Sequence, residues 1–281
     1  MIQIMQAIGA EVRKLGQGTY ELKTVNIKTS EIPVEYAKDI RASILFAGPL
    51  LARTGKVILP PPGGDVIGRR RLDTHFIALS ELGARVEIDG FFKLSANKLV
   101  GREIFLDEAS VTATENAIMA SVIAEGCSVI LNAASEPHVQ DLCKMLNCMG
   151  AKIEGIGSNI LRITGVKKIS GCEFTIGSDF MEIGSFIGLA AVTRGEIEIQ
   201  NVEPEHLRMM KIAFNKLGIR WEVDRNSLSI SAGQELKVVP DIGGMIPKID
   251  DAPWPGFPPD LISIMIVVAT QVEGTVLIHE K

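Results

Sequence analysis

A repeated pattern of glycines and apolar runs constrains the fold of this chain more than any other feature. A glycine precedes a short alternating run of apolar residues at Gly55, Gly126, Gly195 and Gly274, at intervals of 71, 69 and 79 residues. Each run is typical of a β-strand entered from a glycine turn. The nearly constant interval indicates that one supersecondary unit of roughly 70 residues is used several times.

A second glycine pattern recurs with the same period. A glycine between two apolar residues precedes a β-rich run at Gly9, Gly83, Gly150 and Gly218, at intervals of 74, 67 and 68 residues. Each of these glycines follows a stretch with helical periodicity, and glycine in this position commonly ends a helix in the left-handed conformation. The two patterns together predict a repeating unit that contains two helices and several strands.

Four further stretches are predicted to be helices of unusually apolar composition. They are rich in Ala, Ile, Leu and Met and cover residues 37–53, 114–125, 181–194 and 260–272. Helices that are apolar almost all round are expected in a protein interior. We therefore predict an α/β (α+β) fold with buried helices and outer sheets. The chain begins and ends partway through the repeat, so we expect a fragment that lacks both ends of a longer protein.

Composition and charge exclude several classes of protein. The chain has 281 residues, of which 46% are hydrophobic and 22% charged, as in an ordinary globular protein. Its net charge of -5 argues against a nucleic-acid-binding protein. The first residues lack the pattern of a signal peptide, and the longest apolar run, residues 261–270, is too short to cross a bilayer. We expect a cytoplasmic protein with neither a membrane nor a nucleic acid as partner.

Cysteine and histidine spacing gives no sign of a metal site. The four cysteines contain no C-x-x-C pair, so we expect buried, reduced thiols and no metal. Three of the histidines, His138, His206 and His279, are expected at the surface.

The segment 60–73 is predicted to be a loop that handles anions. It holds three prolines, three glycines, Asp65 and the consecutive residues Arg69 to Arg71. Glycine lets the backbone approach a ligand closely, and guanidinium groups suit phosphate or carboxylate. Asp65 would then lie at a reactive tip beside the arginines. A solvated loop with a run of charges remains the alternative interpretation.

The repeat and the loop together resemble the enolpyruvyl transferases. The resemblance covers essentially the whole chain and is strongest in residues 41–50, 62–75, 110–116 and 257–260. It implies two domains, each an inside-out α/β barrel of three repeats, with substrates bound between them. About four of the six repeats are present by this count. The resemblance places residues 1–177 in the loop-bearing domain and residues 178–281 in the second domain.

The resemblance also implies a reaction. The segment 62–75 is similar to that of family members that transfer the enolpyruvyl group of phosphoenolpyruvate to the 3-hydroxyl of UDP-N-acetylglucosamine and release phosphate. This is the first committed step of peptidoglycan synthesis for the cell wall. No cofactor and no obligate protein partner are implied, and we expect no turnover by residues 1–281 alone. The alternatives are a shikimate-pathway enolpyruvyl transferase and a non-catalytic sugar-nucleotide-binding paralogue.

Particular residues follow from the resemblance. Asp65 stands at a loop position where most members carry cysteine, and is implied as a proton donor. Asp260 is implied as the base for the sugar hydroxyl, although its place before a predicted helix also suits an N-cap. His75 is expected to be a hydrogen-bonded structural residue. The residues implied in substrate binding are Arg41, Arg70, Arg71, Leu72, Asp73, Ser110, Val111, Thr112 and Asp260.

Four positions depart from the usual family residue. Arg71 stands where proline is common, and Thr112 where glycine is common. Phe180 stands in place of an arginine and Trp254 in place of a polar, histidine-like residue. The sequence predicts no role for Phe180 or Trp254.

Overall fold

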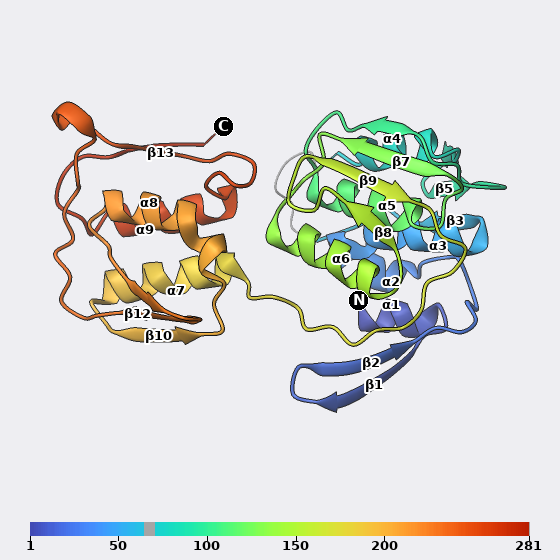
Figure 1. Cartoon of the computed structure of the whole chain (residues 1–281), viewed down its shortest axis with the longest axis horizontal. Helices are drawn as coiled ribbons and strands as arrows, with labels where there is room; N and C mark the ends of the chain where they lie inside the picture. The colour runs from blue at the N-terminus through green and yellow to red at the C-terminus, as the bar shows by residue number, and fades with distance from the viewer. Residues whose placement is uncertain (65–70, 281) are drawn as a thin grey trace. The chain divides into compact units, whose positions relative to one another are not determined.

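The chain forms two compact units (Figure 1), and the computed structural model describes residues 1–64 and 71–280. Unit 1 comprises residues 1–135 and 139–174, and unit 2 comprises residues 136–138 and 175–281. The domain border expected at residues 177 and 178 stays a prediction. Asp65, Arg69 and Arg70 of the predicted loop lie outside the described residues.

Most of the helices and strands before residue 165 belong to unit 1. In chain order they are α1 (Ile2–Ala7), β1 (Glu11–Gly16), β2 (Thr19–Lys23), α2 (Val34–Ala37), the 3₁₀ helix η1 (Arg41–Phe46), α3 (Ala47–Thr54), β3 (Lys56–Leu59), α4 (Asp73–Glu81), β4 (Arg85–Ile88), β5 (Phe92–Ser95), β6 (Glu103–Phe105), α5 (Val111–Ser121), β7 (Cys127–Leu131), α6 (Pro137–Cys148), β8 (Lys152–Glu154) and β9 (Ile160–Thr164). Strands β1 and β2 form a hairpin. The other sheets have the orders β3-β5-β4 and β6-β7-β9-β8, in which only β6 and β7 run parallel.

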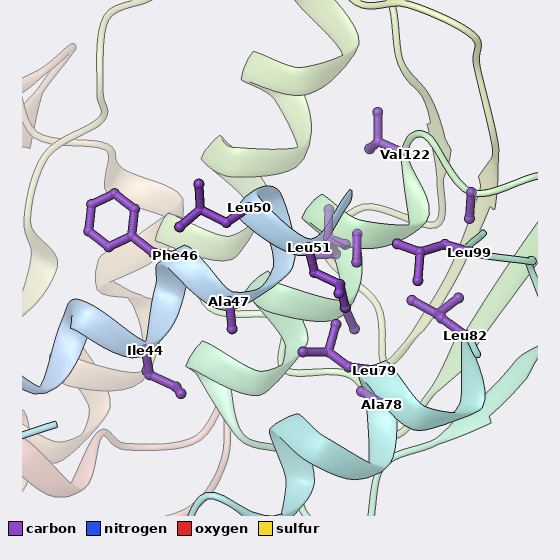
Figure 2. Packing of buried hydrophobic residues seen from close by; sticks show 14 of the residues in the cluster. Ile44, Phe46, Ala47, Leu50, Leu51, Ala78, Leu79, Leu82, Leu99 and Val122 are labelled. Carbon is purple, nitrogen blue, oxygen red and sulfur yellow. The ribbon is translucent and has the colours of Figure 1, made fainter. Parts of the chain in front are cut away.

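Helix α5 lies at the centre of the unit 1 core. It packs against η1, α3 and α4, and most of its residues are buried. Figure 2 shows the apolar side chains around this packing, among them Leu51 of α3 and Leu79 of α4. Ser110 caps α5, so the helix begins at Val111 rather than at the predicted residue 114. The predicted helix 37–53 is divided between η1 and α3.

Unit 2 repeats the same kinds of element. They are α7 (Phe180–Thr193), β10 (Ile197–Gln200), η2 (Pro204–Leu207), α8 (Arg208–Lys216), β11 (Glu222–Asp224), β12 (Ser227–Ile230), η3 (Ile242–Gly244), β13 (Lys248–Asp250), η4 (Pro259–Leu261), α9 (Ile262–Ala269) and β14 (Leu277–His279). One antiparallel sheet has the order β10-β12-β11, and β13 pairs with β14 in parallel. Helices α7 and α9 pack against each other in a separate hydrophobic core.

The glycine patterns predict the element borders correctly. A strand follows each of the four glycines of the first pattern, namely β3, β7, β10 and β14. The four glycines of the second pattern have positive φ values, from 79° at Gly218 to 109° at Gly9, as a left-handed helix end requires. Before β10 the left-handed residue is Arg194, with φ 53°, rather than Gly195.

Three predictions about burial are wrong. Helices α7 and α9 are not buried all round, because Leu189 and Val267 are 51% and 55% exposed. Cys143 is buried, whereas Cys127 and Cys148 are exposed and Cys172 is intermediate. His206 is buried rather than at the surface. Burial depends on which elements pack around a residue, and composition alone does not determine that.

Candidate functional site

The predicted binding residues of unit 1 lie at the starts of three helices. Arg41 begins η1, Asp73 begins α4 after Leu72 at its N-cap, and Ser110 is the N-cap of α5. The Arg41 guanidinium donates a hydrogen bond of 2.8 Å from Nη2 to the carbonyl oxygen of Arg71. This bond fixes the start of η1 beside the start of α4, although the two residues are 30 positions apart.

Two carboxylates hold the Arg71 side chain. Its Nε lies 2.9 Å from Asp73 Oδ2, and its Nη2 lies 3.3 Å from Asp107 Oδ2. The hydrogen bond with Asp73 is the main reason that the pKa of Arg71 is raised, and the nearby charges of Asp73 and Asp107 add to it. The other oxygen of Asp107 accepts a 2.7 Å hydrogen bond from the Thr74 hydroxyl. The Arg71 guanidinium therefore organises the start of α4.

Sequence reasoning missed Asp107. This residue follows β6 closely and precedes α5, and the only available signal was a carboxylate at the end of a strand. Because Asp107 is 36 positions from Arg71, its pairing depends on the tertiary fold.

The start of α5 presents backbone donors. The Ser110 hydroxyl accepts a hydrogen bond of 3.4 Å from the N–H of Ala113, and the Ser110 carbonyl accepts one of 2.8 Å from the Thr114 hydroxyl. The first N–H groups of a helix have no acceptor within the helix, and the helix dipole makes this end partly positive. The arrangement at Val111 and Thr112 suits an anion such as a phosphate.

His75 connects α4 to α5 in the protein interior. Its Nε2 lies 3.2 Å from Thr112 Oγ1, and its Nδ1 lies 2.9 Å from Asn116 Nδ2. The ring is 2% exposed, and burial together with the nearby charge of Arg41 lowers the pKa of His75 to about 4. The expectation that His75 is a hydrogen-bonded structural residue is confirmed, and the ring is neutral at pH 7.

Asp260 lies in unit 2, within η4. Pro258 is the N-cap of η4 and Leu261 that of α9, so Asp260 is not an N-cap. Its side chain is exposed, and it makes no hydrogen bond or ion pair with any residue that the structure describes. The capping alternative is therefore excluded, and the carboxylate is available to a ligand.

The predicted site residues thus fall into three groups. Arg41, Arg71, Leu72, Asp73, Ser110, Val111 and Thr112 lie at the starts of η1, α4 and α5 in unit 1. Asp260 belongs to unit 2. Asp65 and Arg70 lie outside the described residues.

The two unexplained departures from the family pattern contact each other. The rings of Phe180 and Trp254 meet edge to face, with centroids 5.3 Å apart. The Trp254 ring also lies 5.8 Å from His206, whose Nδ1 is 3.0 Å from a carboxylate oxygen of Glu203. Phe180 and Trp254 therefore act as a pair within the unit 2 core.

Within residues 1–64 and 71–280 the structure has neither a cluster of metal-binding side chains nor a membrane-spanning helix. No group of three or more His, Cys, Asp or Glu residues in these ranges could hold a metal ion. None of the helices in these ranges combines the length and apolar character needed to span a bilayer.

Comparison with known proteins places this arrangement in a family. The family model described as EPSP synthase (3-phosphoshikimate 1-carboxyvinyltransferase) matches residues 1–281. UDP-N-acetylglucosamine 1-carboxyvinyltransferase of Treponema denticola is 66% identical over 281 residues, which are 100% of this chain and 66% of that protein. The proteins of the same name from Treponema pallidum and Borreliella burgdorferi are 62% and 57% identical, again over 100% of this chain and 66% of theirs.

Solved structures agree on the fold. The enolpyruvyl transferase NikO from Streptomyces tendae matches with a TM-score of 0.81 at 20% identity, over 99% of this chain and 65% of that one. EPSP synthase from Acinetobacter baumannii matches with a TM-score of 0.67 at 16% identity, over 99% of this chain and 64% of that one. The predicted fold class, the α/β fold of the enolpyruvyl transferases, is confirmed. The chain belongs to the EPSP synthase family of carboxyvinyl transferases, and it spans 66% of the length of the curated relatives named above.

Proposed function

We propose that the protein transfers the enolpyruvyl group of phosphoenolpyruvate to the 3-hydroxyl of UDP-N-acetylglucosamine, with release of phosphate, in peptidoglycan synthesis. The observation that carries this proposal is the 66% identity, through the whole chain, with a protein named for this acceptor. Identity with a solved EPSP synthase is 16%, which makes shikimate 3-phosphate the weaker candidate.

The anion-binding part of this function is assigned to unit 1. In this proposal the first N–H groups of α5, at Val111 and Thr112, bind the diphosphate of the nucleotide. Arg41 and Arg70 supply positive charge for the anionic groups of the two substrates. Arg71 and Asp73 hold the start of α4 in place through their 2.9 Å contact, with Leu72 at the N-cap.

The chemistry requires a base and an acid. Asp260 takes the proton of the 3-hydroxyl as the oxygen attacks C2 of phosphoenolpyruvate, and Asp65 gives a proton to the vinyl carbon. The resulting tetrahedral intermediate then loses a proton from the new methyl group and expels phosphate, which restores the double bond. The absence of a cap or an ion pair on Asp260 among the described residues supports its role.

The acceptor is tested with the protein as encoded by its gene. Phosphate release from phosphoenolpyruvate is measured with UDP-N-acetylglucosamine and with shikimate 3-phosphate. We expect release only with the nucleotide sugar. Release with shikimate 3-phosphate alone would establish the other enolpyruvyl transferase, and binding of UDP-N-acetylglucosamine without any release would establish a non-catalytic paralogue.

The base is tested with a matched pair of variants. Asp260→Asn should lower kcat at least about 100-fold, because general base catalysis contributes that much or more. Asp224→Asn removes another exposed carboxylate of unit 2 and should leave kcat unchanged. Equal kcat values for the two variants would exclude Asp260 as the base.

The role of Asp65 is tested through the pH dependence of turnover. A carboxyl group has an ordinary pKa near 3.9 and a thiol near 8.5. If the residue at position 65 donates the proton, the Asp65→Cys protein should show a different pH profile of kcat from the unchanged protein. Indistinguishable profiles would contradict this role.

A further inference from the structure

Three buried or half-buried polar side chains form a chain of hydrogen bonds behind the start of α5. Asn116 of α5 is 0% exposed and His75 of α4 is 2% exposed, whereas Thr112 of α5 is only partly buried. A buried polar group must find hydrogen-bond partners, because leaving it without them costs free energy. The partners of these three residues determine where each proton lies.

The backbone fixes the orientation of the Asn116 amide. The N–H of Gly48 donates to Asn116 Oδ1 over 2.8 Å, and Asn116 Nδ2 donates to the carbonyl of Ile44 over 2.9 Å. An N–H can only donate and a carbonyl can only accept, so exchanging the amide oxygen and nitrogen would break both bonds. The second N–H of Asn116 Nδ2 is then left for His75 Nδ1, 2.9 Å away.

The Asn116 amide in turn fixes the tautomer of His75. Because Nδ1 accepts from Asn116, the proton of the neutral ring resides on Nε2. Burial and the positive charge of Arg41 lower the pKa of His75 to about 4, so the ring carries only this one proton at pH 7. Nε2–H then donates to Thr112 Oγ1 across 3.2 Å.

The Thr112 hydroxyl therefore accepts from the interior and keeps its own proton free. No residue that the structure describes accepts a hydrogen bond from this hydroxyl. Thr112 is the second residue of α5, in the turn whose backbone N–H groups have no acceptor within the helix. Thr112 therefore brings a hydroxyl proton that has no acceptor among the described residues to the same turn as these N–H groups.

We propose that His75 and Asn116 are positioning residues that hold the Thr112 hydroxyl as a hydrogen-bond donor to the nucleotide diphosphate. This inference rests on the proposed function, since it takes the diphosphate of UDP-N-acetylglucosamine as the anion at the start of α5. It assigns to the Thr112 side chain a contact that backbone groups alone do not provide.

The first test determines the tautomer of His75 in the protein as encoded by its gene. Nitrogen NMR of ¹⁵N-histidine-labelled protein at pH 7 distinguishes a protonated from an unprotonated ring nitrogen. We expect a proton on Nε2 and none on Nδ1. A proton on Nδ1, or on both nitrogens, would overturn the proposal whatever reaction the protein catalyses.

The second test measures nucleotide affinity by calorimetry, with UDP and uridine as the probes. Thr112→Val removes the donor and keeps the side-chain shape, whereas Thr112→Ser keeps the donor. We expect about tenfold weaker binding of UDP by the valine variant and near-unchanged binding by the serine variant, the size expected for one hydrogen bond to a charged group. Uridine lacks the diphosphate and should bind all three proteins equally. Unchanged affinity of Thr112→Val for UDP would contradict the proposal.

The outcomes separate this inference from the proposed function. Phosphate release with UDP-N-acetylglucosamine, together with an unchanged UDP affinity of Thr112→Val, would sustain the function and overturn the inference. Tenfold weaker UDP binding without any phosphate release would sustain the inference about the site and overturn the reaction.

Discussion

Helix α9 has seven apolar residues of eight and helix α5 has six of eleven, yet the more apolar helix is the less buried one. Helix α5 in unit 1 buries seven of its eleven residues, whereas α9 in unit 2 buries three of its eight. Helix α5 packs against η1, α3 and α4, and α9 packs mainly against α7 and η4. Ile266 and Val267 of α9 are 50% and 55% exposed. Whether an apolar helix is buried therefore depends on how many elements pack around it, and not on its composition.

The helix contacts differ in kind as well. A Cβ atom added to Gly48 of α3 would lie 2.5 Å from the carbonyl oxygen of Asn116 in α5. One added to Gly184 of α7 would lie 2.5 Å from Cδ1 of Leu261, at the end of a flexible side chain in η4. The first contact is with backbone, which cannot move aside, and the second is with a side chain, which can change its rotamer. Unit 1 is therefore the more tightly constrained of the two cores.

The largest expected effect comes from removing the same side chain from the two helices. Ile118 of α5 is fully buried and Ile266 of α9 is half exposed. Ile118→Ala should lower the free energy of unfolding by about 3 to 4 kcal/mol, as for other buried cavities, and Ile266→Ala by about 1 kcal/mol. Urea unfolding measures both values.

The two cores can be followed separately in that experiment. Both tryptophans, Trp221 and Trp254, lie in unit 2, so their fluorescence reports its unfolding, while far-UV circular dichroism reports both units. Equal losses of unfolding free energy for Ile118→Ala and Ile266→Ala would contradict the difference in burial between α5 and α9.

A smaller effect is expected from the two helix glycines. Gly48→Ala should destabilise unit 1 by about 2 to 3 kcal/mol, because overpacking against fixed backbone outweighs the gain in helix propensity. Gly184→Ala should change the stability of unit 2 by less than about 1 kcal/mol, because the end of the Leu261 side chain can yield. A larger loss for Gly184→Ala than for Gly48→Ala in urea unfolding would contradict the assignment of the tighter core to unit 1.

The sequence predicted the features that depend on local conformation. The strands after Gly55 and Gly126 and the helix ends at Gly83 and Gly150 follow from the backbone that glycine permits, which is a property of a few neighbouring residues. The family followed from the same repeat together with the loop segment. Both predictions needed no knowledge of which elements come together in space.

The features that the sequence did not predict depend on tertiary contacts. Asp107 and Arg71 are 36 positions apart, and His75 and Asn116 are 41 positions apart. A local sequence pattern therefore predicts neither pair. The contact between Phe180 and Trp254 is likewise long-range. The exposed face of α9 was missed because an apolar helix has the same sequence pattern whether few or many elements surround it.

His75, in the core of unit 1, is expected to make the free energy of unfolding depend on pH, with an effect of intermediate size. The pKa of His75 is lowered from 6.5 to about 4, mainly by burial, so the unfolded chain binds a proton at higher pH than the folded chain. The resulting stability is present above pH 6.5 and is lost as the pH falls toward about 4. We expect a loss of about 2 kcal/mol between pH 7 and pH 5.

Urea unfolding of the unchanged protein and of His75→Gln, at pH 7 and pH 5, checks this contribution. The variant has lost the titrating ring, so the stability difference between the two pH values should be about 2 kcal/mol smaller than in the unchanged protein. An identical pH dependence of the two proteins would mean that His75 does not contribute it.

The smallest expected effect comes from the aromatic pair Phe180 and Trp254 in the core of unit 2. The rings of Phe180 and Trp254 meet edge to face at 5.3 Å, and such pairs contribute roughly 1 kcal/mol beyond their burial. A double-mutant cycle with Phe180→Leu and Trp254→Leu should give a coupling energy of that size in urea unfolding. A matched cycle between Trp254 and Phe214, which pairs with Trp221 instead, should give a coupling energy near zero. Equal coupling in the two cycles would mean that the core of unit 2 responds as a whole, and that the contact between the two family-departing residues has no energetic role of its own.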